Sequence, residues 1–339
     1  MNLLETLLKS TTFDTAAERC VCRPCRVAAI EVGSRAIRLL VVDVLDDLRV
    51  KVLCSRGKEM YLAQYVDEDD ETLSKKLEEI QEVVEKFIVR AKEKDVEKIE
   101  IFGTEAIRQI VKKRESLMRK FFPTLMVLDK RAEAFCSFIA VAKSLPWVAP
   151  DGEDIFILDQ GGGSMEIALG RRTDTMIEIK EYKSYRIGTH ELVELLHEHD
   201  GDVAKFLNAL QQKIIRYSGI PMIDSKTRIV TLGSAATRMA WFTIRQQVGG
   251  MYSTTKVHGK VIEALGMERI VKKAIEDKNR TRRYVGFQNN TTREYEQFIT
   301  GIAAFSEFLQ TVGKKRSVVC GWGTRYGFAL LLAASVNHM

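Results

Sequence analysis

The sequence lacks any apolar run long enough to cross a membrane. Its longest late run, Phe328–Val336, is about half of the length that a bilayer requires. The first residues, Met1–Lys9, have no basic start, and Glu5 interrupts their apolar stretch, so they do not match a secretory signal. We therefore expect a cytoplasmic protein with no membrane partner.

Cysteine is too scarce to build a disulfide scaffold, because the 339 residues contain only six. Three of them cluster at Cys20, Cys22 and Cys25, but a second Cys or His pair at zinc-finger spacing is missing. The other three have the apolar neighbours of core residues: Cys54, Cys136 and Cys320. A metal or redox role for the cluster is the less favoured interpretation.

A large excess of one charge sign is also missing. The 52 Lys and Arg residues nearly balance 46 Asp and Glu, which leaves a formal net charge of +6. This charge is compatible with an anionic substrate but does not by itself indicate nucleic acid, so no nucleic-acid partner is expected. The basic run Lys278–Arg283 could contact an anionic polymer, although such runs are more often solvated loops.

Apolar residues, in contrast, are plentiful. The chain is 45% hydrophobic and 29% charged, which excludes disorder as the dominant state. At about 150 residues per domain, the length favours two domains. Short apolar runs typical of strands alternate with helical segments, which predicts a mixed α/β fold. The predicted strands are Val27–Ile30, Ile37–Val44, Val50–Cys54, Ile99–Phe102, Leu125–Leu128, Ile155–Leu158, Met165–Leu169, Met176–Tyr182, Arg228–Leu232 and Val318–Cys320.

Helical signals fall between these strands. Apolar residues recur at helical spacing after the acidic run Asp67–Glu71, a helix start that the helix dipole favours. Thr104 is placed to cap the next helix, and Glu133 lies on a further helix that ends before Pro146. The stretch Pro146–Gly152 is the most linker-like in the chain.

A short pattern occurs twice, once in each half. Glu31-Val-Gly33-Ser34 ends one predicted strand and leads into another, and Asp159-Gln-Gly161-Gly-Gly-Ser164 does the same. Each copy has an acid at a strand end, then glycine, then a hydroxyl. Self-similarity at this scale predicts two related domains that face each other across a cleft.

These turns have a defined chemistry. Glycines after a strand expose backbone N–H groups that can bind phosphate oxygens, so two such turns can grip a polyphosphate or a nucleotide phosphate chain. The acids at the strand ends suit Mg²⁺, which binds a few carboxylates and keeps several waters. One glycine turn alone would be weak evidence, but the paired arrangement is more specific.

The sequence from about Val27 to Leu332 resembles the exopolyphosphatase and guanosine pentaphosphate phosphohydrolase (Ppx/GppA) family. The resemblance implies two actin-like domains (ribonuclease H-like, ASKHA superfamily) that face each other across a cleft. It also implies the short form of the family, which lacks the C-terminal helical domain that many members carry. The implied boundaries are an N-terminal extension at 1–26, domain I at 27–135 plus 323–339, and domain II at 136–322. The matching stretches are Ala29–Leu40, Gly103–Arg108, Arg131–Ala134, Leu158–Glu166, Thr231–Thr237 and Gly323–Gly327.

The resemblance also implies roles for individual residues. Glu133 matches the catalytic glutamate that activates the attacking water. Asp159 and Glu166, with Glu31 in the first motif, match the carboxylates around Mg²⁺ or Mn²⁺. The remaining implied residues bind the phosphate chain: Gly33, Ser34, Arg35, Arg38, Arg108, Gly161, Gly162, Gly163, Ser164, Gly233 and Ser234.

The implied activity is the release of terminal phosphate from inorganic polyphosphate or guanosine pentaphosphate, by a homodimer that also accepts guanosine tetraphosphate as a ligand. The chain departs from the family in its first motif, where Glu31, Arg35 and Ala36 replace Asp, Asn and Ser. Arg131 and Ala132 replace acids before Glu133, which makes Glu133 a weaker base. Two alternatives therefore stay open: a sensor that binds the same ligands but hydrolyses them poorly, and an ASKHA-type kinase.

Two further sets of residues have less specific explanations. Arg108 could simply pair with Glu105, but its match to the family motif gives the ligand-binding role equal weight. His197 and His199 are two apart, so on a helix they point to different faces and do not form a metal site.

Overall fold

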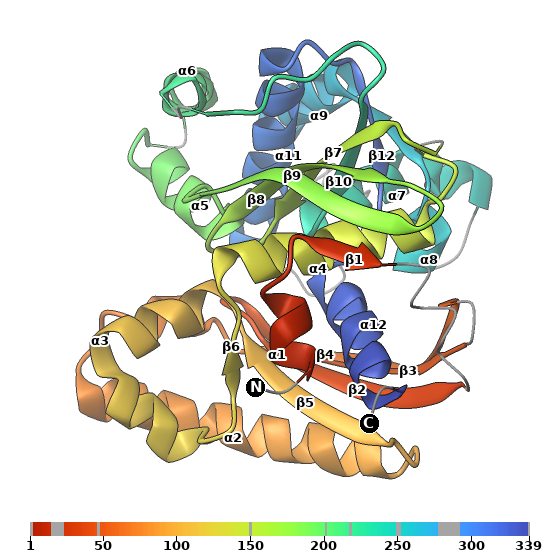
Figure 1. Cartoon of the computed structure of the whole chain (residues 1–339). Helices are drawn as coiled ribbons and strands as arrows, with labels where there is room; N and C mark the ends of the chain where they lie inside the picture. The colour runs from red at the N-terminus through yellow and green to blue at the C-terminus, as the bar shows by residue number, and fades with distance from the viewer. Residues whose placement is uncertain are drawn as a thin grey trace. The chain divides into compact units, whose positions relative to one another are not determined.

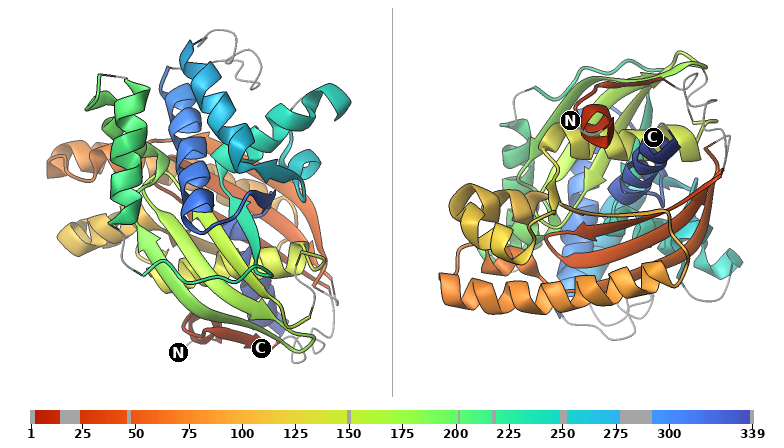
Figure 2. Two further views of the ribbon diagram at one scale, coloured as in Figure 1. Left: turned by 90° about the horizontal axis from the view of Figure 1, so that it is seen from above. Right: turned by 60° about the horizontal axis from the view of Figure 1, so that its bottom comes forward.

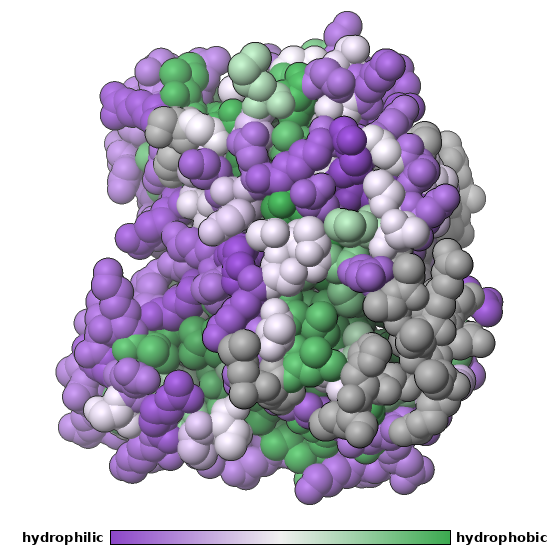
Figure 3. Space-filling view, in the orientation of Figure 1, coloured by the Kyte–Doolittle hydropathy of each residue, from purple (hydrophilic) through white to green (hydrophobic). Residues whose placement is uncertain are grey.

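The computed structural model describes residues 3–14, 24–45, 48–148, 151–200, 202–216, 219–248, 252–276 and 292–337. Cys20, Cys22 and the basic run 278–283 lie outside these residues. Within the described ranges, no helix combines the length and the apolar character that a membrane span needs. In Figure 3 hydrophilic side chains cover much of the visible face.

The chain divides into two compact units (Figure 1). Unit 1 comprises 1–144, 173–179 and 324–339, and unit 2 comprises 145–172 and 180–323. The boundary between the units lies after residue 144, at the end of the helix that carries Glu133, whereas the boundary predicted at 135/136 falls inside that helix. The described part of the expected N-terminal extension belongs to unit 1.

Unit 1 is built on a five-stranded sheet in the order β4-β3-β2-β5-β6. Antiparallel pairing joins β2, β3 and β4, whereas β5 and β6 add in parallel. The helix α2 (Asp70–Lys92) runs along one face of this sheet (Figure 2), because Leu73, Leu77 and Ile80 form its buried stripe. The strands are β2 (Cys25–Val32), β3 (Ala36–Val44), β4 (Val50–Glu59), β5 (Lys98–Gly103) and β6 (Met126–Val127).

The other helices of unit 1 include two that pack on each other, α4 (Lys130–Ser144) and α12 (Thr324–Asn337). The rest are α1 (Leu3–Leu8), the 3₁₀ turn η2 (Leu62–Tyr65) and α3 (Glu105–Phe121). Gly327 is required at the crossing of α4 and α12, since a Cβ there would lie 1.8 Å from the Cys136 carbonyl oxygen. Arg131 donates to the carbonyls of Leu8 and Lys9 and so fastens α1 to α4.

Unit 2 holds most of a seven-stranded sheet in the order β1-β9-β8-β7-β10-β12-β11. Its centre, β7, β10 and β12, is parallel. The strand β1 and the first residues of β9 belong to unit 1, where Phe13 pairs with Ile177. The strands are β1 (Thr12–Asp14), β7 (Asp154–Gln160), β8 (Met165–Arg172), β9 (Met176–Tyr185), β10 (Arg228–Leu232), β11 (Val261–Glu263) and β12 (Arg316–Val319).

The core of unit 2 forms where α11 (Thr292–Thr311) packs against its neighbours and the sheet. Phe298, Phe305 and Phe308 of α11 are almost fully buried there. The remaining helices are α5 (Thr189–His197), α6 (Val203–Ile215), α7 (Ser234–Val248), α8 (Thr254–Val257) and α9 (Ala264–Glu276).

The predicted strands are confirmed, with ends that shift by a few residues. The α2 start is also confirmed, since Asp69 caps it by accepting a hydrogen bond from the Thr72 amide. The predicted cap at Thr104 is wrong: its side chain makes no capping hydrogen bond, because its backbone (φ −115°, ψ −141°) departs from the usual capping conformation. Cys54, Cys136 and Cys320 are buried free thiols, as expected.

Candidate active site

The first turn, in unit 1, connects β2 to β3. The Gly33 amide donates to the Ala36 carbonyl and closes the turn. The carbonyls of Ser34 and Arg35 accept hydrogen bonds from amides of the following segment, 60–63. The turn is therefore anchored through its carbonyl groups. The Arg35 side chain reaches back to Glu59, 2.5 Å from its carboxylate.

Glu31, at the end of β2, lies between two arginines. Its Oε2 is 3.3 Å from Arg325 Nε and 3.9 Å from Arg38 Nη1. Arg325, from α12, also donates to the Leu39 carbonyl. Burial lowers the pKa of Arg325 to about 10, an effect that Glu31 opposes and Arg38 increases. The guanidinium stays charged at neutral pH, so Glu31 is its counter-ion.

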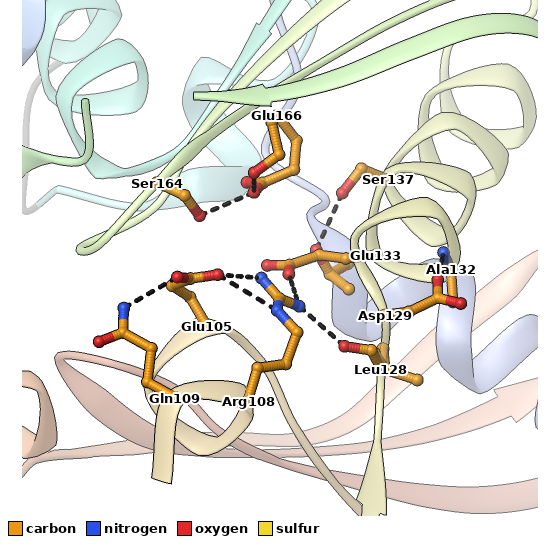
Figure 4. A network of polar contacts seen from close by, with 12 residues as sticks. Glu105, Arg108, Gln109, Leu128, Asp129, Ala132, Glu133, Ser137, Ser164 and Glu166 are labelled. Atoms are coloured by element: carbon orange, nitrogen blue, oxygen red, sulfur yellow. Dashed lines mark hydrogen bonds and ion pairs between the residues drawn. The ribbon is translucent and has the colours of Figure 1, made fainter. Parts of the chain in front are cut away.

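Glu133 lies in the first turn of α4 and belongs to a buried network (Figure 4). Its Oε2 accepts a 2.6 Å hydrogen bond from Arg108 Nη1, which also donates to the Leu128 carbonyl. The other side of the Arg108 guanidinium binds Glu105 Oε2, at 2.8 Å from Nη2. The side chains of Glu133 and Glu105 are each only 11% exposed. Two carboxylates are thus held by one arginine.

The charges of this network are fixed by its contacts. Burial alone would raise the pKa of Glu105, but hydrogen bonds from Gln109 and Arg108 outweigh it and hold that pKa below its usual value. Burial likewise opposes the charge of Arg108, and Glu133 and Glu105 together raise the pKa of that guanidinium. Arg108 therefore stays cationic and orients both carboxylates.

The second turn, in unit 2, connects β7 to β8. The Gly161 amide donates to the Ser164 carbonyl, as Gly33 does to Ala36 in the first turn. The carbonyls of Gly161 and Gly162 accept from the amides of Thr189 and His190 at the start of α5. Neither the Gly162 nor the Gly163 amide donates to an acceptor within the described residues. These two N–H groups are the kind that bind phosphate oxygens.

Gly188 keeps α5 close to this turn. A Cβ at position 188 would lie 2.4 Å from Gly162 O, Gly163 C and Ser164 N. Real Cβ atoms do not approach backbone so closely, so any larger residue must displace the turn.

Two carboxylates accompany the second turn. Asp159 and Glu166 are directly opposite in the antiparallel β7–β8 pair, so both side chains lie on the same face of the sheet. Glu166 is 2% exposed, and its Oε1 accepts hydrogen bonds from Ser164 at 2.7 Å and Ser184 at 2.9 Å (Figure 4). Two neighbouring carboxylates fit a hydrated Mg²⁺ or Mn²⁺. Within the described residues no cluster of three or more candidate ligands occurs.

Glu31 fits a metal less well than this pair, because its carboxylate already faces Arg325 and Arg38. Its role as a ligand stays a prediction. The same holds for phosphate binding by Arg108, whose guanidinium is engaged by Glu105, Glu133 and the Leu128 carbonyl.

Gly233 and Ser234 lie at the end of β10, next to the end of β7. Gly233 has φ +103°, and a Cβ there would lie 2.3 Å from the Gln160 carbonyl oxygen. This glycine lets the start of α7 approach Asp159 and Gln160, because Leu232 pairs with Asp159. The loop formed by Gly233 and Ser234 thus adjoins the second turn within unit 2.

Several residues of these sites make contacts that carry no signal in the sequence. Arg325 lay within a quoted motif, but its pairing with Glu31 joins residues far apart in sequence. His190 and Arg293 were also missed: Arg293 Nη2 lies 2.5 Å from His190 Nδ1, beside the second turn. Burial, followed by the Arg293 charge, lowers the pKa of His190. A basic residue on a distant helix has no local signal that would have revealed this contact.

Solved structures establish the fold class. The Aquifex aeolicus member of the Ppx/GppA family is 26% identical, with a TM-score of 0.75 over 93% of this chain and 100% of that chain. A type II variant of the Aquifex aeolicus Ppx/GppA phosphatase is 25% identical, with a TM-score of 0.71 over 90% and 98%. An exopolyphosphatase from Cytophaga hutchinsonii, 17% identical, shares the fold, with a TM-score of 0.67 over 91% and 97%. The protein has the predicted actin-like α/β fold of the ASKHA superfamily.

The family follows from the sequence match. The model of the Ppx/GppA phosphatase family matches residues 40–335, and the chain belongs to this family. No curated protein matches the chain. Family and fold together assign it to the phosphohydrolases, as predicted.

Proposed function

We propose that the protein releases terminal phosphate from inorganic polyphosphate or guanosine pentaphosphate, with water activated by Glu133. The observation that carries this proposal is the buried Glu105–Arg108–Glu133 network, within a chain of a phosphatase family. A carboxylate held at one oxygen has a fixed direction, which is what a general base needs. Glu105 and Arg108 act as positioning residues for it.

The second turn is proposed to bind the phosphate chain. The Gly162 and Gly163 amides would donate to phosphate oxygens, and the α5 contacts hold the turn in place. Asp159 and Glu166 would hold Mg²⁺ or Mn²⁺, which when bound neutralises charge on the phosphates. Glu133 accepts the proton of the attacking water, whose oxygen bonds to the terminal phosphorus as the bond to the leaving oxygen breaks.

Phosphate release from the full-length protein tests this proposal, with long-chain polyphosphate and guanosine pentaphosphate assayed separately in Mg²⁺. Glu133→Gln keeps the size of the side chain but removes the base, so turnover should fall by roughly 10²–10⁴-fold. Affinity should hold or rise, since one negative charge is lost. Glu115→Gln is the matched control, because Glu115 is exposed on α3 and pairs only weakly with Arg119 at 3.6 Å. Turnover of Glu133→Gln at the parental rate would remove Glu133 from the mechanism.

A second candidate is a sensor that binds these ligands but hydrolyses them poorly. Its support is the 2.6 Å contact between Arg108 and Glu133, since a carboxylate paired with arginine is a weaker proton acceptor. Tight binding of both ligands without phosphate release by the parent protein would favour the sensor. Arg108→Gln would then be expected to increase release.

A further inference from the structure

Unit 2 contains a cavity of about 440 Å³ that the proposed phosphatase function does not use. It lies where the central parallel strands begin, and its lining includes Arg228 at the start of β10 and Arg316 at the start of β12. The second turn, in contrast, follows Gln160 at the end of β7. Because β7, β10 and β12 are parallel, the cavity lies at the N-terminal ends of these strands and the turn at their C-terminal ends.

The cavity is strongly cationic. Among the described residues, four of the twelve that line it are basic and none is acidic; the basic ones are Arg228, Lys314, Lys315 and Arg316. Arg316 lies 3.7 Å from Glu263, but both side chains are well exposed, so this pair neutralises little charge. Within the described residues, Arg228 and Lys315 make no ion pair. An anion in this cavity would therefore meet a net positive charge.

One of these charges is held in a fixed position. Lys314 Nζ donates to the carbonyls of Asp224, Ser225 and Thr227, at 2.6, 3.0 and 2.9 Å. Burial lowers the pKa of this ammonium; Asp224 opposes the shift, and the positive charge of Arg228 increases it. A bound anion would offset both the burial and the repulsion from Arg228.

The same cavity has an aromatic and aliphatic wall. Trp147 is 60% exposed and Val261 is 50% exposed, although both are large apolar side chains. The Trp147 ring is supported by Gly259: a Cβ at that position would lie 3.1 Å from Trp147 Cζ2. An exposed but supported aromatic ring beside a cationic cavity is a stacking surface for a planar group.

We propose that this cavity binds a small phosphorylated molecule with a planar ring, of the size and class of a nucleoside monophosphate. The ring would stack on Trp147, and the phosphate would bind Arg228. Lys314, whose three N–H groups already donate to carbonyls, would contribute its positive charge only. A cavity of this volume lies in the range of small-molecule sites. A phosphate dianion matches four cations better than a single carboxylate does. A bare phosphate chain would leave the apolar wall unused, which separates this ligand from the substrates proposed above.

Isothermal titration of the full-length protein tests the site with three probes: adenosine monophosphate, benzoate and inorganic phosphate. Adenosine monophosphate should bind most tightly, and its affinity should fall with salt. Trp147→Ala should weaken its binding by at least about tenfold, because stacking on the ring is lost. Arg228→Gln should weaken it by about threefold to tenfold. Both residues are exposed, so the variants should fold, and their melting temperatures check this.

Three controls make the result specific to the cavity. Met222→Ala removes a fully exposed apolar side chain, and Lys226→Gln removes a nearby cation, neither of which lines the cavity. Asp159→Asn alters the second turn, at the C-terminal ends of the parallel strands. All three should leave the affinity for adenosine monophosphate unchanged. The proposal is overturned if Trp147→Ala has no effect, if benzoate or phosphate binds as tightly as adenosine monophosphate, or if only Asp159→Asn abolishes binding.

Discussion

The two turns that repeat in the sequence share a backbone arrangement but differ in their charges. In both, the first glycine amide donates to the carbonyl three residues on, and later amides hold the turn through its carbonyls. In the first turn, Glu31 is the counter-ion of Arg325 and Arg35 pairs with Glu59. In the second, the turn itself carries glycines, and two carboxylates accompany it. One sequence pattern thus supports an arginine-rich turn and a carboxylate-rich turn.

From this difference we infer separate tasks for the two turns. A carboxylate that already neutralises a buried arginine stabilises the fold, and its removal leaves a buried charge without its partner. The Glu166 carboxylate of the second turn accepts hydrogen bonds from the hydroxyls of Ser164 and Ser184, and with Asp159 opposite it forms a carboxylate pair that suits a cation. We therefore expect substitution of the first turn's carboxylate, Glu31, to reduce mainly stability, and substitution of the second turn's carboxylates to reduce mainly activity.

The largest contrast should come from Asp159→Asn and Glu31→Gln. Asp159→Asn should lower Mg²⁺-dependent phosphate release by about 10²-fold or more, with little loss of stability. Glu31→Gln should cost up to about 3 kcal/mol in urea unfolding, because buried Arg325 loses its counter-ion, while release falls less than about tenfold. Equal losses of activity in both variants would contradict the division of tasks.

A second contrast compares the two turns by steric substitution of glycine rather than by a change of charge. Gly188→Ala places a methyl group 2.4 Å from the second turn and should displace it, with a loss of turnover of at least about tenfold. A Cβ at Gly33 would lie 3.1 Å from the Ala36 carbonyl oxygen and 3.4 Å from Glu31 Oε1, contacts that a small shift relieves, so Gly33→Ala should disturb its turn less. Phosphate-release kinetics of both variants, at matched folded fractions, measure the difference. A larger loss in Gly33→Ala would show that the first turn binds the reacting phosphate.

Substitution of the serine in each turn should produce a smaller difference, in the free energy of unfolding. Ser164→Ala removes a hydrogen bond to the buried Glu166 carboxylate and should destabilise the protein by about 1–2 kcal/mol. The Ser34 hydroxyl makes no side-chain hydrogen bond to a described residue, so Ser34→Ala should change stability by less than about 0.5 kcal/mol. Denaturant midpoints of both variants report these values, and equal midpoints would contradict the expected order.

The smallest expected effect is on the stability of the protein at acidic pH. The pKa of Glu105 is lowered in the folded protein, so its ionisation stabilises the fold above about pH 4.3, the unfolded value. This contribution is lost as the pH falls through the lowered folded value. Glu105→Gln should therefore flatten the decline in stability below pH 5, by less than about 1 kcal/mol. Unfolding midpoints between pH 3 and pH 7 test this, and an unchanged acid slope would speak against it.

Much of the fold follows from local patterns. Runs such as Ile155–Leu158 and Ile229–Leu232 form strands whose side chains are buried on both faces of a sheet. The repeated turn is visible because acid, glycine and hydroxyl residues keep their order. The short elements α1, β1 and β11 were missed, since segments of three to six residues carry too little periodicity.

The candidate site was only partly accessible from the sequence. The sequence motifs predicted which glycines and carboxylates belong to the site, but they did not predict most of the side chains that contact them. Arg325 reaches Glu31 from the last helix, and Arg108 reaches Glu133 from another helix, contacts that only the tertiary structure brings together. The pairing of Arg108 with Glu105, three residues apart on α3, was predicted from the sequence, and it is confirmed.

Mn²⁺ binding, followed by the electron paramagnetic resonance signal of the free ion, tests the division between the two turns most directly. The parent protein should bind Mn²⁺, Asp159→Asn should bind it at least about tenfold more weakly, and Glu31→Gln should match the parent once its folded fraction is accounted for. Loss of Mn²⁺ binding in Glu31→Gln, with normal binding in Asp159→Asn, would place the cation at the first turn and contradict this account.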